Sequence, residues 1–224
     1  MLYHVRLTIG IFVSAAFSIA AFATAQGETF RTGVIEAVVD GQNYSAYTYA
    51  TEVPDDVADG VTDEQQRAIL ERVAGTTQHS ATFMHQDAMV MASIVLAPET
   101  IYVTLSTRTD HPEGDSVGSF LVKFSLDPEA LELREEADVA VTFYPHGSSY
   151  DDYYALTDGV LQLTSLEVLD SQTMAISGVI SGLLSLQDDF DVAHNPDEVL
   201  QVEATFNIEQ VATSSLAFEL VTSE

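Results

Sequence analysis

A short acidic segment near the C-terminus carries side chains of the kind that bind metal ions. Asp188, Asp189 and Asp191 lie within four positions, and Asn195 and Asp197 follow closely. Calcium takes six to eight oxygen ligands, which protein loops supply from clustered carboxylate and amide groups. The five residues therefore predict a calcium site within one loop, although their spacing does not follow the EF-hand order. A second acidic group offers further oxygens: Asp55, Asp56 and Asp59.

A tyrosine-rich segment over residues 144–154 has side chains suited to a carbohydrate or protein ligand. Tyr150 and Tyr153 flank two aspartates, Asp151 and Asp152. A tyrosine ring offers a flat amphipathic surface, and a neighbouring carboxylate accepts hydrogen bonds from a ligand. We predict a ligand-binding surface at these four residues, for an extracellular protein or a glycan. The alternative is that two of the rings in the segment fill the core beside a short strand.

A serine motif occurs in mid-chain. Residues 114–118 read GDSVG and match G-x-S-x-G, the turn that exposes the nucleophilic serine of α/β-hydrolases. That turn works between a strand and a helix, whereas the residues after Ser116 alternate as a strand. We expect an ordinary turn here, and a serine hydrolase using Ser116 stands only as an alternative function.

The histidines lack the spacing of a transition-metal site. No pair has the H-x-H or H-x-x-x-H pattern that places two imidazoles together. His79 and His85 would lie about 20 Å apart on one unbroken strand. We therefore expect histidines of the surface or of loops, namely His79, His85, His111, His146 and His194.

The first 25 residues have the order of an export signal. One arginine precedes an almost wholly apolar run over residues 7–23, which ends in the small residues Ala23-Thr24-Ala25. This order predicts cleavage before Gln26 and a mature protein that is periplasmic or secreted. The alternative is a membrane anchor, because the apolar run could just span a bilayer. No second long apolar run follows, so no membrane span is expected after cleavage.

The remaining chain is strongly acidic and contains no cysteine. It carries all 35 aspartates and glutamates but only six basic residues, a net charge of −29. Such a surface repels phosphate backbones, which excludes nucleic acid as a partner and disfavours anionic membranes. Solubility explains the charge, and binding of divalent cations or basic partners is the alternative. Without cysteine, thiol catalysis, thiolate metal sites and disulfides are excluded.

The elements that must position these groups are mostly strands. Asp40-Gly41 lies between two β-rich segments, 32–39 and 43–51, and predicts a hairpin with a type I′ turn. Thr62 begins a capping box, and Gly75 provides a stop, so one short helix is expected between them. Period-two patterns predict further strands at 80–85, 88–96, 101–107, 117–126, 139–144, 160–169, 173–186, 199–211 and 216–221.

This pattern predicts one domain over residues 26–224. About ten strands with one short inserted helix indicate an all-β fold, either an antiparallel β-sandwich or a partly closed barrel. The C-terminal strands also resemble those of uncharacterised secreted bacterial β-sandwich domains, in which a G-x-h-x-h-T-x-h strand precedes an h-S-G-x-h strand. The resemblance rests on residues 158–166, 174–180 and 202–206. It implies the fold and no activity.

The expected function is non-enzymatic binding of calcium or of an extracellular partner. The acidic and tyrosine-bearing loops carry this expectation, because their side chains are of the types that such ligands contact. A structural or assembly protein of the cell surface is the alternative, in which strands pair with copies of the same chain.

Overall fold

The computed structural model describes residues 27–91, 94–107, 118–134, 139–146, 153–188 and 193–213. In these ranges the chain forms twelve strands and one helix, α1 (Glu64–Val73). The strands are β1 (Thr29–Val39), β2 (Gln42–Glu52), β3 (Thr77–His79), β4 (Ala81–Gln86), β5 (Met89–Met91), β6 (Ile94–Ala97), β7 (Thr100–Ser106), β8 (Ser119–Leu126), β9 (Ala140–Tyr144), β10 (Tyr153–Val168), β11 (Thr173–Asp188) and β12 (Ala193–Thr213).

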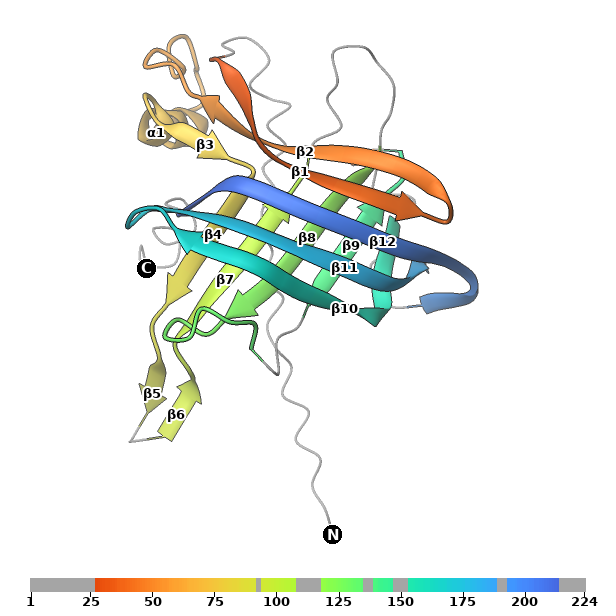
Figure 1. Cartoon of the computed structure of the whole chain (residues 1–224). Helices are drawn as coiled ribbons and strands as arrows, with labels where there is room; N and C mark the ends of the chain where they lie inside the picture. Colours follow the sequence, from red (N-terminus) through yellow and green to blue (C-terminus); the bar gives the residue numbers. More distant parts are fainter. Residues whose placement is uncertain are drawn as a thin grey trace.

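The strands form two layers that cross each other (Figure 1). Ten strands are hydrogen-bonded in the order β11-β10-β9-β8-β7-β4-β12-β1-β2-β3, and β11 also pairs with β12. The sheet therefore closes partly on itself. All pairings are antiparallel except the short contact of β12 with β4. The predicted all-β, antiparallel fold class with one short helix is confirmed.

The first hairpin forms where the sequence predicts it. β1 and β2 pair from Val39↔Gln42 outward, with Asp40 and Gly41 as the two turn residues. Their φ angles are 48° and 79°. A type I′ turn needs positive φ at both positions, which aspartate tolerates and glycine adopts without strain.

The helix α1 begins one residue later than the capping box predicts. Asp63, not Thr62, is the N-cap residue, and its Oδ1 accepts a hydrogen bond of 2.7 Å from the Gln66 N–H. Aspartate at this position satisfies a free N–H and complements the helix dipole. Leu70 and Val73 are buried, so the helix packs through its last two turns.

The core lies between the two layers. In β8 every second residue is buried, with Phe120, Val122, Phe124 and Leu126 on the inner face, as the period-two pattern predicts. Each fully buried side chain of this size contributes roughly 1.5–3 kcal/mol. The opposite layer supplies alternating inner residues of β12, such as Phe206. Both layers therefore stabilise one core.

One predicted strand is instead a hairpin. Residues 88–96 were expected as a single strand, but β5 and β6 form a separate two-stranded sheet there. Glycine and polar turn residues are scarce in this segment, so its sequence gives little sign of a turn. The strand expected at 216–221 lies outside the described residues. No helix in the described part of the chain has the length and apolarity to cross a membrane.

Candidate metal centre

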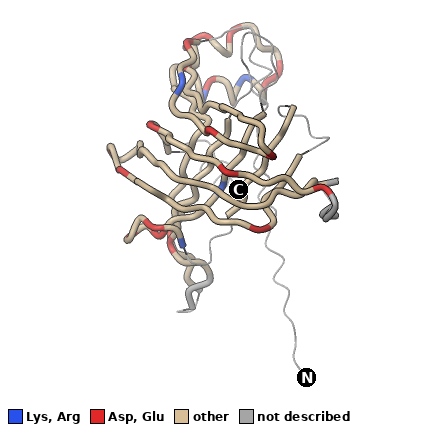
Figure 2. Tube along the Cα trace, turned by 45° about the vertical axis from the view of Figure 1, so that its right-hand side comes forward, with Lys and Arg blue, Asp and Glu red and all other residues tan. Residues whose placement is uncertain are grey.

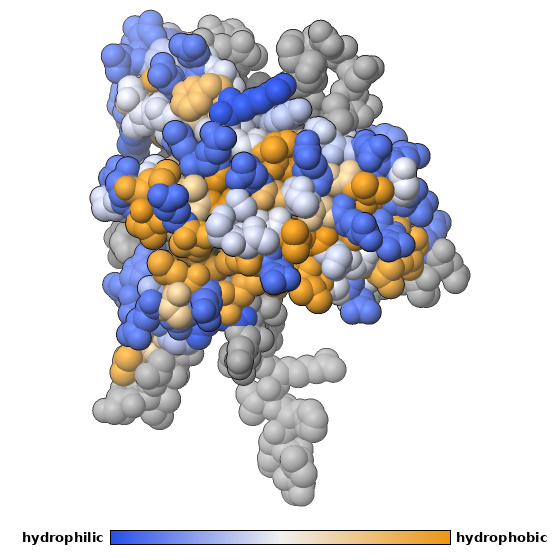
Figure 3. Space-filling model, viewed as in Figure 1, coloured by the Kyte–Doolittle hydropathy of each residue, from blue (hydrophilic) through white to orange (hydrophobic). Residues whose placement is uncertain are grey.

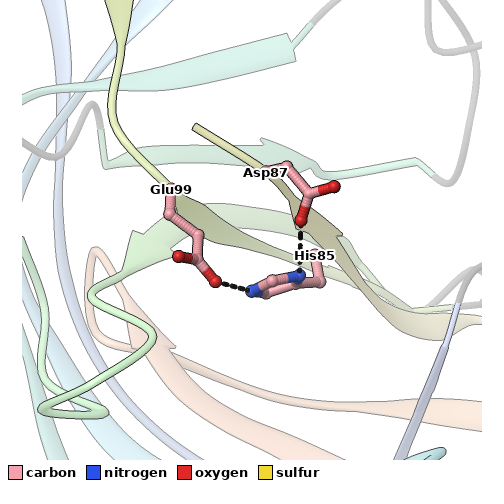
Figure 4. Close-up of side chains that lie close together, drawn as sticks. All are labelled: His85, Asp87 and Glu99. Carbon is pink, nitrogen blue, oxygen red and sulfur yellow. Dashed lines mark ion pairs between the residues drawn. The ribbon is translucent and has the colours of Figure 1, made fainter. Parts of the chain in front are cut away.

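Three side chains capable of binding a metal ion meet where β4 ends and β7 begins (Figure 4). The Nε2 atom of His85 lies 2.7 Å from Oε1 of Glu99, and Nδ1 of the same ring lies 3.8 Å from Oδ1 of Asp87. One ligand atom of each residue lies within 4.8 Å of the other two. Among the described residues, no other three histidine or carboxylate side chains converge this closely.

Strand pairing brings this cluster together. β4 and β7 are antiparallel, and their register ends with Gln86 opposite Thr100. The next residue at each strand end is Asp87 on one side and Glu99 on the other, and His85 lies one position before Gln86. The chain between Asp87 and Glu99 carries the β5–β6 hairpin. The cluster therefore lies at the base of that hairpin.

Arg134 fixes the backbone beside Glu99. Its Nη1 donates a hydrogen bond of 3.0 Å to the Glu99 carbonyl and one of 2.5 Å to Oγ1 of Thr100. The hydroxyl of Thr100 donates in turn to the carbonyl of Pro98 at 2.9 Å, and Thr100 is buried. These contacts hold the start of β7, so the Glu99 carboxylate extends from a well-anchored backbone position.

The three side chains are exposed enough to rearrange around a divalent ion. The side chains of His85, Asp87 and Glu99 are 42%, 93% and 48% exposed. Metal–ligand bonds of about 2.0–2.2 Å place neighbouring ligand atoms roughly 3–3.5 Å apart. Glu99 lies beside Nε2 of His85 and Asp87 beside Nδ1, so an ion bound to one ring nitrogen requires one carboxylate to change rotamer, which exposed side chains can do. One imidazole with two carboxylates suits zinc, copper or iron better than calcium, which prefers an all-oxygen shell.

The electrostatic surroundings favour a cation. Acidic residues are scattered over the trace in Figure 2 and outnumber basic ones, as the totals of 35 and 7 for the whole chain require. Such a field raises the local concentration of divalent cations. With a neutral imidazole, the cluster itself carries two negative charges. A bound divalent ion would neutralise both.

The predicted tyrosine site is divided by the structure. Tyr150, Asp151 and Asp152 lie outside the described residues. Tyr153 begins β10, and its ring centroid lies 5.9 Å from that of Tyr144 at an interplanar angle of 37°. Tyr154 packs against the core. The ligand-binding surface stays a prediction, with Tyr153 placed beside a second aromatic ring at its edge.

The predicted calcium site does not form one loop. Asp188 is the last residue of β11, whereas Asn195 and Asp197 lie within β12. The two strands pair up to Asp188↔Ala193, so only residues 189–192 connect them. The remaining two predicted ligands, Asp189 and Asp191, lie outside the described residues. Calcium binding here stays a prediction.

The second acidic group faces a hollow beside α1. Asp55 and Asp59 line this hollow of about 580 Å³ together with Glu71 and Arg67. Their carboxylates are not part of any three-residue group within 4.8 Å among the described side chains. The Arg67 guanidinium is occupied by the carbonyl of Val61, to which its Nε donates at 2.9 Å. The hollow therefore lacks the convergence that calcium needs.

Two further predictions have different outcomes. Ser116 lies outside the described residues, and the described chain resumes as strand β8, in line with the expected strand after the motif. His79 and His85 do not share one unbroken strand but lie in β3 and β4, which pair with β2 and β7 respectively. His85 is exposed, as predicted for a surface histidine, but it also lies beside two carboxylates, which the sequence analysis did not predict.

The spacing of the histidines does not indicate this cluster, because its other two side chains are carboxylates. The available signal was His-x-Asp at the end of a strand, with Glu99 twelve positions after Asp87. Comparison with known proteins adds no further residue to the site. No family model, no curated protein and no solved structure matches this chain.

Proposed function

We propose that this chain is an extracytoplasmic, non-enzymatic binding protein that takes up a divalent transition-metal ion at His85, Asp87 and Glu99. The observation that carries the proposal is the convergence of one ligand atom from each residue within 4.8 Å. The export signal that the sequence predicts over residues 1–25 supports the compartment. The open, exposed position of the cluster leaves coordination sites for water, which suits reversible uptake.

The chemistry of the three ligands selects the metal. An imidazole nitrogen binds zinc, nickel and copper well, and affinity rises along the series from manganese to copper. Calcium prefers six to eight oxygen ligands, and two carboxylates supply too few of them. The metal proposed for this cluster is therefore a transition metal, with zinc as the most suitable probe because it has no redox chemistry.

Isothermal titration of zinc into the mature protein tests the proposal. We expect one zinc per chain, and His85→Gln should weaken binding by at least about tenfold, as loss of a ligand interaction does. His146→Gln is the matched control, because His146 is exposed and outside the cluster. Excess calcium should not displace the zinc. Absence of binding to the wild type, or equal loss in the two variants, would refute the site.

The calcium site at Asp188, Asp189, Asp191, Asn195 and Asp197 remains a separate proposal. Its test is thermal melting with and without calcium, since a ligand at a hundred times its dissociation constant adds about 2.7 kcal/mol to the free energy of unfolding. A calcium response that survives His85→Gln but not the double change Asp188→Asn and Asp197→Asn would support it. A response to plain salt of equal ionic strength would indicate charge screening instead.

Assembly with copies of itself is a second candidate function, and the edge of β10 supports it. In the described chain β10 pairs with β9 only at Tyr154 and Ala155, and residues 157–168 have β11 on one side and no described strand on the other. Strand edges of this kind pair readily with other chains. Asp158 and Glu167 lie on this edge, and their charges oppose self-pairing unless salt screens them.

Sedimentation velocity in low and high salt tests the assembly candidate. An edge-to-edge dimer should appear in high salt and disappear in Val160→Lys, which adds a charge at an exposed position of β10. A monomer under every condition would contradict it.

A further inference from the structure

The β5–β6 hairpin is an uncharged projection from an acidic protein. In Figure 1 it extends away from the two layers at the lower left, where the coloured part of the surface in Figure 3 includes apolar atoms. Residues 88–98 contain no charged side chain, and Ser93 is their one uncharged polar residue. Among the described strands, β5 and β6 pair only with each other. The hairpin therefore stands apart from the core.

The two described large side chains of β5 face opposite sides. The register shifts between the pairs Met89↔Ala97 and Val90↔Val95, so the extra residue lies in β6, and the consecutive Met89 and Val90 of β5 are expected to point to different faces of the hairpin. They are 53% and 57% exposed. A groove in another protein would cover an apolar patch on one face of the hairpin. A lipid interface, which surrounds an inserted hairpin, would cover apolar residues on both faces.

A metal ion bound by His85, Asp87 and Glu99 would change the charge at the base of this hairpin. Asp87 is the nearest charged residue before the hairpin, and Glu99 is the nearest one after it. Bringing two carboxylates up to an apolar medium is costly, because ionised groups lose hydration there. A divalent ion held by these carboxylates and His85 would cancel their charge. Metal binding would then remove the obstacle to contact between the hairpin and an apolar phase.

We propose that the β5–β6 hairpin inserts into the interface of a neutral, zwitterionic lipid bilayer, and that a divalent ion at His85, Asp87 and Glu99 strengthens this insertion. The part concerning the ion rests on the proposed function. The hairpin strands, of three and four residues, extend roughly 10–13 Å, less than half of a hydrocarbon core about 30 Å thick. The insertion is therefore shallow, at the depth where water and headgroups still satisfy backbone groups.

Charge argues for a neutral membrane rather than an anionic one. The chain carries a formal net charge of −28, and an anionic leaflet would repel it. The same charge opposes burial of the hairpin by a second copy, because two such chains would have to approach closely. A zwitterionic surface avoids both penalties and covers both faces of the hairpin.

The absence of tryptophan makes the test direct. Val90→Trp places a single tryptophan on the hairpin, and Val38→Trp places one at an exposed apolar position of β1 as the matched control. With phosphatidylcholine vesicles and zinc, we expect a blue-shifted emission and quenching by brominated lipid for Val90→Trp only. Zinc should raise vesicle affinity at least about fivefold, and vesicles should raise zinc affinity by the same factor, as linkage requires.

The double variant Asp87→Asn with Glu99→Gln, made in the Val90→Trp background, separates the two proposals. It should bind vesicles without zinc and should not respond to zinc. If calorimetry shows zinc bound to the wild type but Val90→Trp never enters vesicles, the membrane inference fails and the metal function stands. If zinc does not bind but the double variant inserts, the metal function and its control of the hairpin fail, while membrane contact stands.

A third outcome would replace the lipid by another copy of the chain. A blue shift of Val90→Trp without vesicles that grows with protein concentration would show that a second chain covers the hairpin. It would overturn the membrane inference. Thermal melting of each variant beside the wild type establishes that all of them are folded.

Discussion

The Nε2 atom of His85 lies 2.7 Å from Oε1 of Glu99, although the two residues are 14 positions apart in the sequence. The antiparallel pairing of β4 with β7 creates this contact, and the β5–β6 hairpin accounts for most of the chain between them. The contact joins the two strand ends from which the hairpin projects. Any ligand that binds there acts on the base of the hairpin as well.

Glu99→Gln should weaken zinc binding more than Asp87→Asn does. Glu99 extends from a backbone held by Arg134, whereas Asp87 is 93% exposed and 3.8 Å from the imidazole. A pre-positioned ligand loses less conformational entropy on binding a metal. We expect a difference of about tenfold in the dissociation constant, or about 1.4 kcal/mol. Competition with a fluorescent zinc indicator measures it, and an equal or reversed ranking would contradict the geometry.

His79 should make the protein less stable in weak acid. Its Nδ1 is buried without a hydrogen-bond partner among the described residues, and burial lowers the pKa of this imidazole below 6.5. Between that lowered pKa and 6.5 the unfolded chain binds more protons than the folded one, so stability falls as the pH drops through this window. Above it the penalty is absent.

The His79→Phe variant isolates this effect. Its free energy of unfolding, measured in urea at several pH values, should fall less steeply than that of the wild type between about pH 6.5 and 5. His146→Phe, at an exposed histidine, is the control and should follow the wild type. Parallel curves for His79→Phe and the wild type would exclude a role for His79.

Asp170 should stabilise the turn between β10 and β11 as a charged group. Its Oδ1 accepts hydrogen bonds of 2.7 Å and 2.8 Å from the N–H groups of Gln172 and Thr173. Hydrogen bonds from Thr173, and next from Gln172, lower the pKa of this carboxyl below its ordinary value. The ionised form is therefore favoured by folding. Its contribution is present above pH 3.8 and is lost as the pH falls through the lowered pKa.

Unfolding of Asp170→Ala at two pH values checks this sign. The variant should melt below the wild type at pH 7, and the difference should shrink in acid near about pH 2. Asp170→Asn keeps an acceptor oxygen without the charge, so its melting temperature should lie between the two. If the melting temperature of Asp170→Ala lies equally far below that of the wild type at both pH values, Asp170 does not stabilise the turn through its charge.

Phe143→Ala should destabilise the core severely. Phe143 is fully buried, and its ring centroid lies 4.9 Å from those of both Phe120 and Tyr44. Truncation leaves a cavity between these rings and should cost about 3–5 kcal/mol in the free energy of unfolding. Phe143→Leu refills most of the space and should cost clearly less. Urea denaturation at neutral pH measures both, and a loss below 1 kcal/mol for alanine would contradict the packing.

Local sequence determined those elements whose energetics are local. Asp40 and Gly41 tolerate the positive φ angles of the tight turn, so the β1–β2 hairpin follows from two residues. Asp63 begins the helix by accepting a hydrogen bond at its N-terminus, and Gly75 ends it by adopting a positive φ. The N-cap is one position after the predicted Thr62. The alternation in β8 likewise places Phe120 and Phe124 inward, because side chains of a strand alternate in direction.

Tertiary structure alone decided which polar groups meet. Composition and spacing predicted a calcium ligand at Asp188 and a ligand-binding surface at Tyr153. Strand pairing places Asp188 at the end of β11 and Tyr153 beside Tyr144. His85 and Glu99 became neighbours only through the register of β4 with β7. Register depends on burial of inner faces across the whole sheet, which no local window of sequence contains. For this reason the sequence determined the fold class and its turns, whereas the contact of His85 with its two carboxylate neighbours depends on the folded sheet.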